Sequence, residues 1–271
     1  MLKLLTQNTT PILFMKKTFY TIATALLVII GGTACKKETA TAGGGPSTGS
    51  NIPTTVGYTL SANGDISGTY NGYFLEALFS PYTTAGCVFF STPQPLKVST
   101  NSSPVTNCSV TSVYCNGTKL QFDPTGISYN DTTNALIFPP ATWSVTGNSL
   151  MPSFTYTYTG ALPVFTNTAA LPATINRSQD LVISLAGVTG YDQASLSVND
   201  YAGHSVSAFV SNTASSITIV KDSLAKLTPT TNQNYGYIDI ELIKYNPQAI
   251  GGKTFLFIKL FDYEKTNITL Q

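Results

Sequence analysis

The sequence predicts an all-β protein with two antiparallel β-sandwich domains, which follow a signal peptide and a flexible tether. Charged residues make up 10% of the chain, and many Thr, Ser, Asn, Tyr and Val residues replace them. Short apolar or alternating runs are separated by turn residues such as Asn63-Gly64-Asp65 and Asn116-Gly117. No long stretch has a helical period, and this combination is typical of secreted β proteins.

The N-terminal stretch has the layout of a secretory signal. Two lysines follow Met15, an apolar run extends from Thr18 to Ile30, and small residues lead to Cys35. An apolar run of this length is too short to span a bilayer comfortably, which favours a cleaved signal over a transmembrane helix. We therefore expect residues 1–34 to be removed, with Met15 as the true start.

Thr33-Ala34-Cys35 resembles the end of a bacterial lipobox. The resemblance implies that Cys35 receives a diacylglycerol thioether and an acylated amine, so that the membrane is a partner through a lipid anchor. Several acyl chains on one residue make a stable anchor. Lys36 stands where an Asp would favour inner-membrane retention, which implies the outer membrane or the cell surface. The alternative is an uncleaved anchor followed by a free or disulfide-bonded Cys35.

The net charge narrows the class of protein further. Without Lys3, Lys16 and Lys17, the mature chain has 11 of the 14 basic residues against 13 acidic ones, a formal charge of −2. Nucleic-acid binding is not expected, since such proteins have basic faces.

Three cysteines remain besides Cys35, namely Cys87, Cys108 and Cys115. In an oxidising compartment one disulfide and one thiol are expected, and the sequence leaves all three pairings open. No Cys-x-x-Cys or Cys/His ligand set is present, so a metal site is not expected.

Residues 35–56 are expected to form the tether, because this Gly/Ser/Thr-rich segment has no apolar periodicity. The first sandwich is expected over residues 57–162. Its candidate strands are 72–79, 85–90, 96–100, 105–113, 119–122, 135–138, 142–145 and 154–158. The run 73–79 could instead be a helical turn.

Residues 160–176 contain Pro163 and Pro172 and are expected to connect the two domains. The second sandwich, over residues 174–271, is expected to be immunoglobulin-like, because about seven strands in about a hundred residues suit that fold. Its candidate strands are 181–185, 195–198, 205–210, 216–220, 237–245, 253–263 and 267–270, with a helical turn at 222–227.

The lipobox, the Gly-rich tether and the hydroxyl-rich β body together resemble the uncharacterised surface lipoproteins of the Bacteroidota. That resemblance implies O-glycosylation at Asp followed by Ser or Thr, which points to Thr132 and Ser223. The alternative reading is an ordinary turn at Asp131 and a helix cap at Asp222.

No catalytic or cofactor-binding set is predicted. The single histidine, His204, lies in an expected hairpin loop, where it should be exposed and uninvolved in catalysis. The carboxylates are scattered, and no segment suggests the facing pair that a glycosidase needs. Glu76 lies among apolar residues and, on a strand, is expected to face water; if buried, it would need a partner or a raised pKa.

Aromatic faces give the one lead toward binding. Phe255, Phe257, Phe261 and Tyr263 share one face of an expected strand, while aliphatic residues occupy the other face. The leading hypothesis is therefore a non-enzymatic adhesion or ligand-capture module with a glycan or protein ligand. The runner-up is a structural subunit of an envelope complex, and a hydrolase whose site is not visible in the sequence is a remote alternative.

Overall fold

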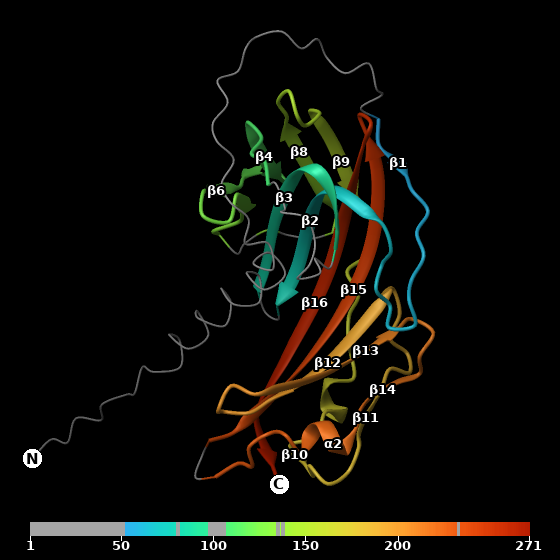
Figure 1. The fold of residues 1–271 in the computed structure, drawn as a ribbon, viewed down its shortest axis with the longest axis vertical. Coiled ribbons are helices and arrows are strands. Elements are labelled where there is room, and N and C mark those ends of the chain that lie inside the picture. Colours follow the sequence, from blue (N-terminus) through green and yellow to red (C-terminus); the bar gives the residue numbers. More distant parts are fainter. Residues whose placement is uncertain (1–51, 80–81, 97–106, 134–135, 137–138, 232–233) are drawn as a thin grey trace, which may run out of the picture.

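A computed structural model describes residues 52–79, 82–96, 107–133, 136, 139–231 and 234–271 (Figure 1). The predicted signal, Cys35 and the tether up to Asn51 lie outside these residues. Within the described part, none of the helices is long and apolar enough to cross a membrane.

The all-β prediction is confirmed, since strands hold 54% of the residues and helices 3%. The upper half of the molecule in Figure 1 contains the strands that come first in the chain. They are β1 (Thr54–Thr55), β2 (Thr69–Phe79), β3 (Tyr82–Pro95), β4 (Ser112–Cys115), β5 (Thr118–Lys119), β6 (Gln121–Asp123), β7 (Ser128–Asn130), β8 (Ala141–Thr146) and β9 (Phe154–Tyr158).

The remaining elements lie in the lower half, except that β15 runs from there into the upper half and β16 runs back down from it (Figure 1). They are the 3₁₀ helix η1 (Thr168–Ala170), β10 (Thr174–Ile175), β11 (Leu181–Ser184), β12 (Gln193–Asn199), β13 (Ser205–Ser211), β14 (Ser216–Ile219), the short helix α2 (Lys221–Leu224), β15 (Gly236–Ile250) and β16 (Lys253–Leu270).

The long hairpin β15–β16 runs through both halves of the molecule (Figure 1). Its turn, Gly251-Gly252, has positive φ at both residues (56° and 77°), the conformation that two-residue hairpins require. The largest sheet has the order β13-β12-β15-β16-β2-β3-β7-β6, with β16 and β2 parallel. Strands from both predicted domains therefore share one sheet.

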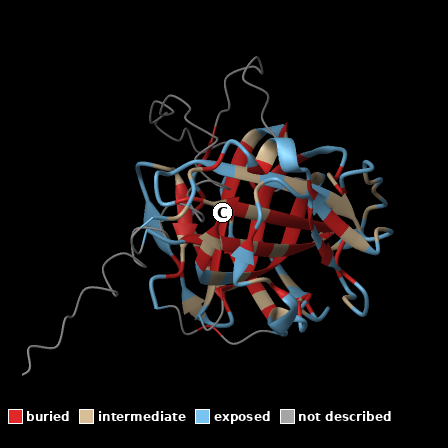
Figure 2. Ribbon diagram, turned by 90° about the horizontal axis from the view of Figure 1, so that it is seen from below, coloured by how far each residue is buried: buried red, intermediate tan, exposed pale blue. Residues whose placement is uncertain are grey.

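Smaller sheets cover one face of this central sheet. The four-stranded sheet β5-β4-β8-β9 encloses an upper core that contains Phe74, Trp143 and Phe257. The two-stranded sheet β11-β14 covers a lower core that contains Leu196 and Ile240. Buried residues accordingly concentrate in the central strands, and exposed ones lie at the periphery (Figure 2).

A third core lies on the opposite face of the upper half. It joins Leu75, Leu256 and Ile258 and is covered by the segment that leads into β2. Gly64 of this segment lies so close to β12 that an added Cβ would come 2.8 Å from Gln193 Cβ, and its φ is +80°. Only glycine fits this contact without strain.

Several predicted elements differ from the observed ones. The strand expected at 72–79 is present within β2, so the alternative of a helical turn there is wrong. The strands expected at 253–263 and 267–270 are one strand, β16, with Asn267 at positive φ. Of the strand expected at 105–113, residues 105 and 106 lie outside the described residues, and β4 begins at Ser112. Before β4, the Tyr129 hydroxyl accepts from the Val110 N–H and donates to the Val110 C=O, which occupies both backbone groups. The helical turn expected at 222–227 is shorter, ending at Leu224.

Candidate functional site

The aromatic face predicted to bind a ligand is part of the core. Phe255 and Phe257 are fully buried in the upper core, and Phe261 is 4% exposed in the lower core. Tyr263 is half-buried and packs against the lower core. The prediction of a binding face is wrong for the three phenylalanines, because the smaller sheets cover the face that they occupy.

Glu76 is also buried, contrary to the expectation that it faces water. Its Oε2 lies 3.2 Å from Lys259 Nζ on the neighbouring strand, and its Oε1 accepts a 3.1 Å hydrogen bond from Trp143 Nε1. Lys259 is fully buried as well and donates to the carbonyl oxygens of Tyr158 and Gly160. Burial outweighs the attraction of Lys259 and raises the pKa of Glu76 to about 6.

This ion pair lies on the same sheet face as both covered cores. Phe257 of the upper core and Phe261 of the lower core flank Lys259 along β16. The pair therefore separates two apolar cores and holds the chain that connects the halves at Gly160. We assign it a structural role.

The structure contains none of the predicted disulfides. Cys87, Cys108 and Cys115 are buried and carry thiols. Burial raises the pKa of the Cys87 and Cys115 thiols, which keeps both neutral.

The two predicted glycosylation residues differ in exposure. Thr132 is exposed beside a turn in which Asp131 Oδ1 accepts from the Thr133 N–H (2.8 Å). Ser223 lies half-buried within α2, whose first turn contains Asp222. Their modification remains a prediction.

His204 lies in the β12–β13 loop, as predicted, with 60% of its side chain exposed. Its Nδ1 lies 2.8 Å from Asp200 Oδ2. Asp200 is buried, and burial alone would raise its pKa. Hydrogen bonds from the Thr228 N–H and from His204 outweigh burial and lower that pKa, so the contact stabilises the loop.

Four carboxylates form a cluster that the sequence analysis missed. Asp239 and Glu241 on β15 lie opposite Glu264 and Asp262 on β16, respectively. Cross-strand partners share a face of the sheet, so all four side chains point to the same side. We call these residues the acidic cluster. It lies opposite the lower core, to which Ile238, Ile240 and Leu242 point in alternation.

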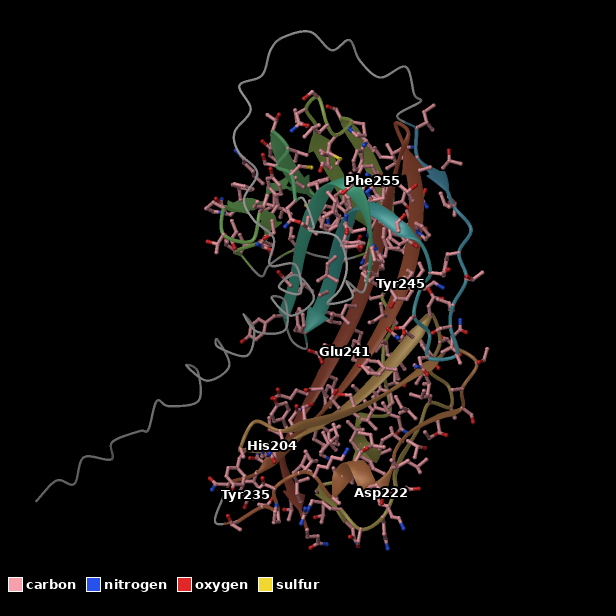
Figure 3. The ribbon with its side chains drawn as sticks, in the orientation of Figure 1. His204, Asp222, Tyr235, Glu241, Tyr245 and Phe255 are labelled. Atoms are coloured by element: carbon pink, nitrogen blue, oxygen red, sulfur yellow. The ribbon has the colours of Figure 1, made fainter. Side chains whose placement is uncertain are left out.

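The acidic cluster lies near the middle of the molecule, where Figure 3 labels Glu241 between Tyr245 and His204 along the long axis. Neighbouring β12 supplies two hydrogen bonds. Ser195 Oγ donates to Glu241 Oε2 (2.9 Å), and Asn199 Nδ2 donates to Asp239 Oδ2 (3.1 Å).

Burial and mutual repulsion perturb these carboxylates. Asp262 is 7% exposed, and burial together with Glu241 and Glu264 raises its pKa to about 7. Burial and the negative charges of Asp262, Glu264 and Glu241 raise the pKa of Asp239 to about 8. Asp239 Oδ1 and Asp262 Oδ1 are buried and have no hydrogen-bond partner. Each such oxygen costs free energy unless a ligand satisfies it.

One sequence signal could have revealed the acidic cluster. The runs Asp239-Ile240-Glu241 and Asp262-Tyr263-Glu264 each place two acids on one face of a strand. Counting outward from a two-residue turn at Gly251-Gly252 pairs these acids directly. The expected strands stopped short of a complete hairpin, so this register was not counted.

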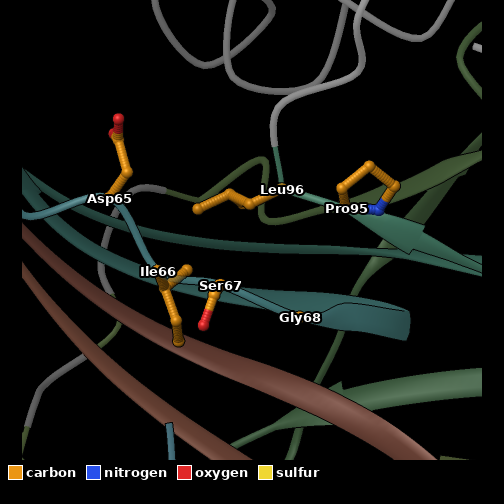
Figure 4. A pocket seen from close by; sticks show the side chains of 6 residues that line it. All are labelled: Asp65, Ile66, Ser67, Gly68, Pro95 and Leu96. Carbon is orange, nitrogen blue, oxygen red and sulfur yellow. The ribbon is translucent and has the colours of Figure 1, made fainter. Parts of the chain in front are cut away.

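A small pocket of about 230 Å³ lies elsewhere, between the segment Asp65–Gly68 and the residues Pro95 and Leu96 (Figure 4). Ile66 and Leu96 give it a partly apolar wall. It does not include the acidic cluster, and its lining has no pair of groups suited to catalysis.

No protein-family model, curated protein or solved structure matches the chain.

Proposed function

We propose that the chain is a lipid-anchored protein of the bacterial envelope that captures a ligand without catalysing a reaction. The N-terminal stretch Met15–Cys35 supports the anchor and the envelope location. The acidic cluster is the observation that carries ligand capture, because two of its buried oxygens lack a partner. A ligand that donates hydrogen bonds or positive charge would satisfy them.

Glycan hydroxyls and basic protein side chains both meet this requirement. The aromatic platform that often accompanies sugar binding is missing from the candidate residues, since Trp143 and the phenylalanines of β16 are buried. This favours a protein ligand over a glycan.

A structural subunit of an envelope complex is the alternative. The same acidic cluster would then lie against lysine or arginine residues of one permanent partner. Charge pairs that are fully desolvated in an interface are costly to break, so such a partner would remain bound through purification.

A hydrolase remains a distant alternative, which one observation favours. Glu241 and Asp262 are cross-strand neighbours on one face of the hairpin, and a glycosidase uses two nearby carboxylates. The described pocket does not lie over them. Turnover of chromogenic glycosides that is lost in Glu241→Gln would support this reading.

The test compares the purified chain in detergent with its Asp262→Asn variant on a glycan array and in pulldowns from envelope extract. Asp222→Asn is the matched control, because it removes the same charge from an exposed position on α2. Capture that Asp262→Asn abolishes and Asp222→Asn preserves supports the proposal. One stoichiometric partner supports the subunit reading, and no capture by any form contradicts both.

Anchoring has its own test. Acyl labelling should mark the chain and fail in Cys35→Ser, and protease shaving of intact cells should report whether the body is exposed. An unacylated chain released into the medium would contradict the proposal.

A further inference from the structure

The lower part of the β15–β16 hairpin has fewer pairing partners than the upper part. β2 ends at Phe79, opposite Asp262. Between Asp262 and Thr269, where β10 joins, β15 is the only described strand that pairs with β16. We call this stretch, residues 236–241 of β15 and 262–268 of β16, the lower seam. Its closure depends on what the two strands do to each other.

The acidic cluster occupies the upper end of the lower seam and lacks a counter-charge there. None of the ion pairs within the described residues involves its members. Like charges directly opposite each other on neighbouring strands are destabilising. Asp262 is only 7% exposed, and its Oδ1, like that of Asp239, is buried without a hydrogen-bond partner. A proton on one carboxyl of a cross-strand pair removes the repulsion and converts an acceptor into a donor.

We propose that the acidic cluster is a proton-dependent latch. The lower seam is closed while each cross-strand pair, Asp239 with Glu264 and Glu241 with Asp262, holds a proton, and it loosens when both carboxyls of a pair ionise. Burial and mutual repulsion raise the pKa of Asp262 to about 7 and that of Asp239 to about 8. The latch therefore responds near neutral pH.

The residues around the acidic cluster leave the proton as the neutralising charge. β12 contributes Ser195 and Asn199, which do not titrate and each donate one hydrogen bond to a carboxylate. Tyr237 and Tyr245 of β15 interact with the acidic cluster, and burial raises the pKa of both hydroxyls, so they stay neutral. Lys265, farther along β16, donates to a backbone carbonyl oxygen instead.

The direction of the response follows from the raised pKa values. In an open seam water solvates the carboxyls, which then ionise at about pH 4. The closed seam binds protons that the open seam releases, so a rise in pH favours opening. The lower seam is also irregular, because its register shifts between Gly236 and Ile238 and Asn267 has a φ of 60°. Opening should therefore begin there.

The experiment measures amide hydrogen exchange by mass spectrometry in the full chain, purified in detergent, at pH 6.5 and pH 9. Protection of residues 236–241 and 262–268, corrected for the intrinsic exchange rate, should fall at least about tenfold at pH 9. Residues 253–258, which β15 and β2 flank, should change far less.

The double variant Asp239→Asn/Asp262→Asn leaves one ionisable carboxyl in each pair. It should lose most of the pH response, whereas Asp222→Asn, which removes an exposed carboxylate on α2, should keep it. Because each Asn replaces a carboxyl that is mostly protonated at pH 6.5, the double variant should be about as stable there as the unmodified chain. A large loss of stability at pH 6.5 would contradict the latch.

Infrared difference spectra read the protonation itself. The C=O band of protonated carboxyl groups should be present at pH 6.5, disappear at pH 9 and be weaker in the double variant. Absence of this band at pH 6.5 would overturn the proposal, and so would a loss of protection that is equal in the double variant or uniform along the chain. Neither measurement uses a ligand, so a failure of ligand capture leaves the latch intact, and a failure of the latch leaves ligand capture intact.

Discussion

Two buried carboxylates lie on opposite faces of the same central sheet and differ in what surrounds them. Glu76 meets a lysine ammonium and an indole N–H within 3.2 Å. Asp262 meets Glu241 and Glu264, and one of its oxygens has no partner. Burial raises the pKa of both groups, to about 6 and about 7.

The difference teaches how to separate a structural carboxylate from a ligand site by geometry. A raised pKa alone does not distinguish the two, because burial produces it in both places. The presence or absence of a neutralising group within the chain does distinguish them. Glu76 is neutralised within the chain, whereas Asp262 requires a proton or a cation from outside.

The largest expected loss of stability comes from breaking the ion pair between Lys259 and Glu76. Lys259→Met leaves Glu76 buried without its cation, and we expect a loss of about 3–5 kcal/mol of unfolding free energy at pH 7. Urea unfolding followed by Trp143 fluorescence measures it. Lys253→Met, a half-buried lysine at the hairpin turn, is the control and should cost far less.

A second variant keeps this test interpretable. In Lys259→Met/Glu76→Leu both charges are absent, so most of the lost stability should return. If the single and double variants are equally unstable, packing rather than charge compensation explains the effect, and the contrast with Asp262 fails.

The acidic cluster should make the free energy of unfolding depend on pH. The folded-state pKa values of Asp239 and Asp262 are raised to about 8 and about 7, so the folded chain binds protons that the unfolded chain releases. Stability should therefore fall as pH rises from 5 to 9. Relative to Asp262→Asn, the fall should be on the order of 2 kcal/mol.

The comparison with Asp262→Asn is needed because the raised pKa of Glu76 also makes stability fall with rising pH, up to about pH 6. Denaturant titrations of both proteins at each pH give the difference. A difference that does not change with pH would mean that Asp262 titrates normally and needs no counter-charge.

The sequence predicted what depends on local pattern. Alternation located most strands, and Asn, Gly and Asp marked the turns, so the all-β class followed. It did not predict which face of each strand is covered. Phe255 and Glu76 were both expected at the surface, because nothing local to β2 or β16 reveals that β8 and β9 pack over them. The acidic cluster was missed for a related reason: Asp239 and Glu264 meet only through the register of the complete hairpin.

Asp192, which precedes β12, offers an intermediate case. It accepts from Tyr58 Oη (2.7 Å), Lys244 Nζ (2.8 Å) and the Tyr245 N–H (2.9 Å). Tyr58→Phe removes one of these three donors and should cost about 1 kcal/mol. Urea unfolding measures it, with Tyr201→Phe as the exposed control. A cost as large as that of Lys259→Met would show that counting donors does not measure compensation.

The smallest loss of stability is expected beside Asp200, because backbone N–H groups stabilise its carboxylate. Its oxygens accept from the N–H groups of Thr228 (2.6 Å) and His204 (2.9 Å), and both remain in His204→Ala. The lost ring contact is exposed to water, so the variant should lose less than about 1 kcal/mol. Asp200→Ala should cost more, since it leaves both N–H groups without their acceptor. If His204→Ala costs as much as Asp200→Ala, backbone donors alone do not hold a buried carboxylate. Asp262, which has no such donor on one oxygen, would then depend even more on protonation.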